Sequence, residues 1–230
     1  MPPEGLPRSD ESWIGPVADQ PDDSMPVASR EEVFGGRVWS VVRDQVRIGA
    51  HDAVRDVLLH PGAVAIIALD DEDRVLLIRQ YRHPVGMYLF EPPAGLLDVG
   101  GEPALETAKR ELAEEAGVQA RDWRVLVDLF NSPGGSSEAI RVYLARGLSA
   151  LPEGRPNTGE AEEAHLPQAW VDLDAAADLV LTGAIGSPSA VAGILALVAA
   201  RGAGFDGLRP GDAPWEPREW LEKSGRVRGE

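Results

Sequence analysis

One amphipathic helix pattern, set between strand-like segments, is the feature that most constrains how this 230-residue chain can fold. Residues 103–116 repeat apolar side chains at helical spacing, and Gly117 follows them as a typical helix stop. The apolar positions fall within an arc of about 80° and form a predicted core face: Leu105, Ala108, Leu112 and Ala116. Because such a face must pack against another element, we expect this helix to cover a sheet formed by its neighbours.

Apolar runs on both sides of the helix predict that sheet, and their order predicts its architecture. Strands come first, one helix is embedded among them, strands follow, and two helices come last, which indicates a mixed sheet covered on both faces. The acidic residues 70–73 predict a hairpin turn between two strands. The predicted strands are residues 38–48, 53–60, 62–69, 74–81, 123–130 and 139–146, and the two last helices are residues 173–181 and 188–200.

The composition of the two ends predicts tails around one domain. Residues 1–33 are rich in Pro, Asp and Ser and hold too little apolar surface to order themselves, so we expect a disordered tail. Residues 34–203 form the predicted domain. Residues 204–230 return to a composition rich in Gly and Pro, and we expect them to wrap the surface.

Composition also excludes several classes of function. The chain holds 38 Asp and Glu against 22 Lys and Arg, so nucleic acid and anionic membranes would be repelled at long range. It has no cysteine, which removes thiolate metal sites and cysteine nucleophiles and is compatible with a cytoplasmic location. The most apolar segment, residues 190–200, is about half the ~20 residues that a transmembrane helix needs. A small phosphorylated substrate remains possible, because a bound divalent cation inverts the local field.

Two carboxylates on the predicted helix point to such a cation. Glu111 and Glu115 stand at i,i+4 on one edge of the core face, and we expect neither to have a helical cation in reach, because none lies three or four positions away. Glu114 stands further round, and Arg110 can pair with Glu106 or Glu114. A solvated pair of like charges is one interpretation, and oxygen ligation of magnesium beside a phosphate is the other.

The flanking residues favour the second interpretation. From Gly95 to Val118 the chain closely resembles the Nudix box, with Glu102, then seven residues, then Arg110-Glu111-Leu-Ala-Glu-Glu-Ala-Gly-Val. Every defined position from Glu102 onward is matched. Six residues, where the usual box has five, separate Gly95 from Glu102, and the extra residue falls in a Gly-rich loop where an insertion costs little.

The resemblance extends from about residue 36 to residue 201 and is strongest to the ADP-ribose pyrophosphatase branch. Residues 79–98 and 131–138 are similar to that branch, and Pro133 lies fifteen residues beyond Val118, the spacing that marks it. The resemblance implies the Nudix fold, an α/β fold in which a mixed β-sheet is sandwiched between helices (α/β/α), with an N-terminal antiparallel sheet. It also implies a homodimer in which residues 36–60 cross to the partner.

The same resemblance implies a function and a set of site residues. We expect Mg²⁺, with Mn²⁺ as a possible substitute, to serve hydrolysis of the diphosphate of ADP-ribose to AMP and ribose 5-phosphate. The implied catalytic residues are Glu138, Glu114 and Arg110: Glu138 corresponds to the catalytic base and Arg110 to the arginine that orients the glutamates. The implied metal ligands are the carbonyl of Ala94 together with Glu111, Glu114 and Glu115, and the implied substrate-binding residues are Arg55, Arg82, Glu91 and Pro133.

Alternatives remain at this point. The weaker alternative for Glu138 is an exposed loop carboxylate, and the alternative for Arg55 and Arg82 is membership of surface ion pairs. The substrate can be another nucleoside diphosphate derivative, such as GDP-mannose, NADH or an ADP-sugar. A Nudix domain that binds a nucleotide sugar without cleaving it is a third hypothesis.

Overall fold

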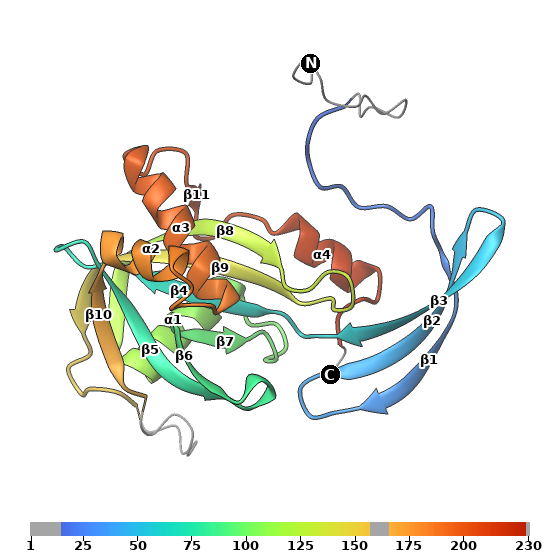
Figure 1. Ribbon diagram of the computed structural model, residues 1–230, viewed down its shortest axis with the longest axis horizontal. Helices are drawn as coiled ribbons and strands as arrows, with labels where there is room; N and C mark the ends of the chain where they lie inside the picture. Colours follow the sequence, from blue (N-terminus) through green and yellow to red (C-terminus); the bar gives the residue numbers. More distant parts are fainter. Residues whose placement is uncertain (1–14, 157–165, 229–230) are drawn as a thin grey trace.

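A computed structural model describes residues 15–156 and 166–228 and confirms the α/β/α architecture (Figure 1). The strands lie in three sheets, of order β1-β2-β3, β10-β5-β6 and β11-β8-β9-β4-β7. The strands are β1 (Val27–Gly35), β2 (Ser40–Ile48), β3 (His51–Leu59), β4 (Ala63–Ala68), β5 (Arg74–Arg82), β6 (Met87–Glu91), β7 (Ala94–Leu96), β8 (Val118–Phe130), β9 (Ala139–Ala150), β10 (Gln168–Asp172) and β11 (Arg209–Pro210). The helices are α1 (Ala104–Ala116), α2 (Leu173–Leu181), α3 (Pro188–Gly202) and α4 (Glu216–Lys223), and a single 3₁₀ turn spans His83–Val85.

The central sheet is mixed and is buried on both faces. Strand β4 runs parallel to β9 and antiparallel to β7, while β8 and β9 are antiparallel. Alternate residues of β4 serve different cores: Val64 and Ile66 pack with α1, whereas Ala65 and Ile67 pack with α2 and α3. This alternation explains why the sequence of β4 is an unbroken run of apolar residues.

The N-terminal sheet is antiparallel, as the resemblance implied, but it begins earlier than expected. Residues 27–33, which we expected to be disordered, belong to β1 and pair with β2. Arg30 Nε lies 2.7 Å from the buried Asp44 Oδ1 of β2, and this ion pair anchors the edge strand. Figure 1 shows this sheet set apart from α2 and α3 and joined to the central sheet through β3 and β4. The part of the predicted tail at residues 1–14 lies outside the described residues.

The C-terminal segment also holds more structure than predicted. Residues 204–230, which we expected only to wrap the surface, contain helix α4, and Trp215 and Leu221 are buried. The guanidinium carbon of Arg141 lies 4.7 Å from the centre of the Trp215 ring. The predicted hairpin turn at residues 70–73 is confirmed between β4 and β5. Within the described residues, no helix is both long and apolar enough to cross a membrane.

Candidate active site

Helix α1 carries the predicted carboxylates, and its core face brings them into the protein. Ala108 and Leu112 are fully buried against the central sheet, as their spacing predicted. The helix ends at Gly117, whose φ of 69° is a left-handed conformation that favours glycine. Glu111 and Glu115 stand at the edge of this face and are only 7% and 4% exposed. Burial of two neighbouring carboxylates requires compensation by positive charge or hydrogen-bond donors.

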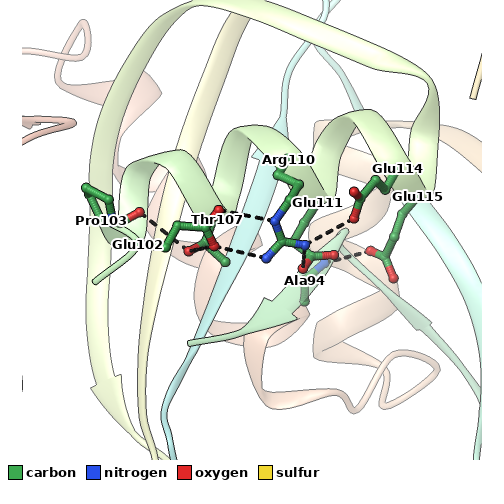
Figure 2. Close-up of polar contacts among 8 residues, drawn as sticks. All are labelled: Ala94, Glu102, Pro103, Thr107, Arg110, Glu111, Glu114 and Glu115. Atoms are coloured by element: carbon green, nitrogen blue, oxygen red, sulfur yellow. Dashed lines mark hydrogen bonds and ion pairs between the residues drawn. The ribbon is translucent and has the colours of Figure 1, made fainter. Parts of the chain in front are cut away.

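Arg110 supplies part of that compensation (Figure 2). Its guanidinium lies 2.7 Å from Glu111 Oε1, 3.1 Å from Glu114 Oε2 and 3.1 Å from Glu102 Oε2. The hydrogen bonds with these carboxylates raise the pKa of Arg110, and its bond to Glu102 lowers the pKa of that carboxyl. One arginine thus holds three carboxylates of the predicted box in fixed positions.

This network corrects two expectations about charge pairing. Glu111 does have a helical cation in reach, because the long Arg110 side chain bends across to its sequence neighbour. Spacing rules consider only partners three or four positions away and therefore miss this contact. Glu106 pairs with Lys109 at 2.8 Å rather than with Arg110. The predicted pairing of Arg110 with Glu114 is confirmed.

Strand β7 approaches the same edge of the helix. The amide of Ala94 donates to Glu115 Oε2 at 2.8 Å, which ties the carboxylate to the strand. At Gly95 a Cβ atom would stand 2.1 Å from the carboxyl carbon and Oε1 of Glu111. The absence of a side chain at Gly95 therefore gives the Glu111 carboxylate its place beside β7.

The loop between β7 and α1 contains the extra residue of the predicted box. The amide of Glu102 donates to the carbonyl of Val99 at 3.1 Å, and Gly101 has a positive φ of 76°. This turn returns the chain to the helix, where Glu102 accepts from Thr107 Oγ1 at 2.8 Å and pairs with Arg110. The insertion leaves Glu102 within reach of its partners.

The donor set suits a hard divalent cation. Glu111, Glu114 and Glu115 offer only carboxylate oxygens, and two of them are buried against a strand whose residue 94 was predicted to add a carbonyl. In this structure Arg110 contacts Glu111 and Glu114. Among the described residues, no three Asp, Glu or His side chains are already arranged to hold a metal ion.

Glu138 stands in a second polar cluster, at the end of the β8–β9 loop that also contains Pro133. Its Oε2 accepts from Asn131 Nδ2 at 2.6 Å, and its Oε1 lies 3.7 Å from His60 Nε2. The side chain of Glu138 is 19% exposed, so the alternative of a freely exposed loop carboxylate is wrong. Sequence reasoning missed His60, because it lies some eighty residues away and shares no motif with Glu138.

The predicted substrate-binding residues are brought together only in part. Arg82 Nη2 lies 2.7 Å from Glu91 Oε2 across the β5–β6 pair, and Glu91 is buried. Arg55 is exposed on β3 and donates to the carbonyl of Val54, and among the described residues it makes no ion pair with Glu91.

Comparisons with known proteins place this chain among proteins of one family and fold. The family described as "NUDIX domain" matches residues 59–191. A protein named "ADP-ribose pyrophosphatase" from Mycobacterium tuberculosis is 47% identical over 191 residues, which cover 83% of this chain and 90% of that protein. A protein of the same name from Bacillus subtilis is 37% identical over 128 residues, or 55% and 69% of the two chains. A solved structure titled "Crystal structure of ADP compounds hydrolase" has a TM-score of 0.65 at 23% identity, covering 91% of this chain and all of that one, and it supports the fold.

Proposed function

This chain belongs to the Nudix family, and we propose that it hydrolyses the diphosphate of ADP-ribose to AMP and ribose 5-phosphate. The main observation behind this proposal is that three carboxylates lie together on one edge of α1, beside β7 and Arg110: those of Glu111, Glu114 and Glu115. The names of the two relatives support this substrate, and one of these relatives is matched over 90% of its length.

Nudix hydrolases generally use divalent metal ions, and we propose Mg²⁺, with Mn²⁺ as a substitute, for this chain. Glu111, Glu114, Glu115 and the carbonyl of Ala94 would hold it. When bound, such an ion neutralises diphosphate charge and lowers the pKa of water. The all-oxygen donor set and the burial of two of its carboxylates support this assignment.

The chain's own residues would orient the carboxylates and remove a proton. Arg110 fixes Glu102, Glu111 and Glu114 relative to one another. Glu138 is the proposed general base: it accepts a proton from the water whose oxygen forms the new bond to phosphorus, while the bridging oxygen leaves with the other phosphate. The hydrogen bond from Asn131 supports this role, because it holds the carboxylate in one orientation.

The substrate would be recognised beside the edge of α1 that carries Glu111 and Glu115. Arg82 and Glu91 are the proposed contacts to the nucleotide or its diphosphate, together with Pro133 of the β8–β9 loop. Arg55 is the proposed contribution of a second copy of the chain. The exposed position of Arg55 on the N-terminal sheet supports that arrangement. The homodimer and a cytoplasmic location belong to the same proposal, as does a domain that extends beyond the predicted limits 34–203 to include β1 and α4.

A substrate panel tests this proposal. The purified chain is incubated with Mg²⁺ and, separately, ADP-ribose, NADH, GDP-mannose or diadenosine polyphosphate, and kcat/KM is measured for each. We expect ADP-ribose to have the highest value. A higher value for another compound would reassign the substrate within the family, and tight binding without cleavage of any compound would instead indicate a binding module.

A further inference from the structure

The loop that ends in Glu138 is attached to the end of β3. The amide of Leu58 donates to the carbonyl of Gly135 at 2.9 Å, and the amide of Ser137 donates back to the carbonyl of Leu58 at 3.0 Å. The amide of His60 then donates to Ser137 Oγ at 3.0 Å. Because of these bonds, the backbone around Glu138 has a fixed position relative to His60.

The ring of His60 is oriented by its other nitrogen. The amide of Gly62 donates to His60 Nδ1 at 3.0 Å, so Nδ1 carries no proton. In the neutral ring the proton is then on Nε2, the atom that lies 3.7 Å from Glu138 Oε1. The imidazole side chain is 10% exposed, so water has little access to this contact.

Burial, together with the charge of Arg218 on α4, favours the neutral form of this histidine. Burial lowers the pKa of His60; Glu138 opposes this shift, and the charge of Arg218 adds to it. Arg218 Nη1 is buried, has no hydrogen-bond partner among the described residues, and would lie 2.8 Å from a Cβ at Gly62. Val227, in the C-terminal segment, also forms an isolated parallel β-bridge with His60. The histidine is therefore a neutral Nε2–H donor at neutral pH.

We propose that His60 is a positioning residue for the reaction, and that its Nε2–H holds Oε1 of Glu138 while Asn131 holds Oε2. This inference rests on the proposed role of Glu138 as the base. A distance of 3.7 Å is too long for a hydrogen bond, and such contacts tighten when substrate brings the base into its working position. A carboxylate held at both oxygens keeps one orientation toward the water it deprotonates.

The expected effect follows from the strength of hydrogen bonds to charged groups. Loss of one such bond should lower kcat by about tenfold to a hundredfold. KM should change by less than about threefold, because His60 acts through Glu138 rather than on the substrate.

A pair of near-isosteric variants and a double-mutant cycle test this inference. His60→Met removes the donor and His60→Gln restores an amide donor, and each is compared with Glu138→Gln and with the double variant His60→Met/Glu138→Gln. His51→Leu, at an exposed histidine where β3 begins, is the matched control. The measurements are kcat and KM for ADP-ribose, and the melting temperature of each variant. If His60→Met does not fold, His60→Leu takes its place.

We expect His60→Met to lose kcat, His60→Gln to regain most of it, and the double variant to be no slower than Glu138→Gln. Equal losses in the Met and Gln variants, or losses that multiply in the double variant, would overturn the role of His60 and leave Glu138 as the base. Near-normal activity of Glu138→Gln would instead overturn the base assignment, and the role of His60 with it.

Discussion

Substitution of Gly95 by alanine should remove activity and leave the fold intact. The added Cβ would stand 2.1 Å from the carboxyl carbon of Glu111, whereas ordinary contacts begin at 3.4 Å. The carboxylate must therefore move by at least about 1.3 Å, and a misplacement of that size in a catalytic group costs about a hundredfold in rate. The atoms displaced are the far end of a flexible side chain, and Gly95 has no positive φ, so the free energy of unfolding should change by less than about 1 kcal/mol.

Two other glycines provide matched controls. At Gly186 nothing lies within 4 Å of an added Cβ, so Gly186→Ala should change neither activity nor stability. At Gly193 the Cβ would stand 2.7 Å from Ile67 Cδ1 in the core, so Gly193→Ala should destabilise the fold by about 1–3 kcal/mol, less a helix-propensity gain of up to about 1 kcal/mol.

The assay combines kcat for ADP-ribose with urea unfolding of each of these variants. Full activity in Gly95→Ala would show that the Glu111 carboxylate is not needed beside β7. A large loss of stability in the same variant would show that the strand, rather than the carboxylate, had moved. Either result would refute the reasoning from the close approach of Gly95 and Glu111.

Three further outcomes are expected. Replacing Arg141 by methionine should destabilise the fold by about 1–3 kcal/mol in urea unfolding, while kcat of the folded variant is unchanged. The carbonyls of Ala213 and Pro214 lose a donor, and Asp128 keeps only its ion pair with the exposed Arg209. A chelator should abolish turnover, added Mg²⁺ should restore it, and Mg²⁺ should raise the melting temperature of the wild type more than that of Glu115→Gln. The pKa of Glu102 is lowered, so its contribution to stability is complete above the ordinary value of 4.5 and is lost as the pH falls through the folded-state pKa. In Glu102→Gln, the free energy of unfolding should therefore fall less steeply with decreasing pH in this range. A slope equal to that of the wild type would contradict this prediction.

The sequence predicts those parts of the fold that depend on buried apolar pattern. Helix α1 and strand β4 appear where the spacing places them, because each buries a continuous apolar face. Strand β1 was missed because nearly all of its side chains are exposed and it forms through backbone pairing with β2. Helix α4 was missed because its short pattern lies among Gly and Pro, and its order comes from packing of Trp215 and Leu221.

The candidate site likewise has features that the sequence predicts and features that it does not. Glu111, Glu114 and Glu115 were predictable because they share one helix, and their spacing fixes their common edge. The contact of Arg110 with Glu111 and that of His60 with Glu138 were not predictable: the first depends on a side-chain conformation, and the second on how β3 meets a loop far along the chain.

The rate of AMP formation from ADP-ribose, compared between the wild type and Glu115→Gln at saturating Mg²⁺, tests the central claim most directly. Glu115 is buried on α1 and accepts from the amide of Ala94, and its conversion to a neutral amide keeps the shape of the side chain. We expect AMP and ribose 5-phosphate in equal amounts from the wild type, and a rate at least about a hundredfold lower from a folded Glu115→Gln. Equal rates from the two proteins would contradict this claim.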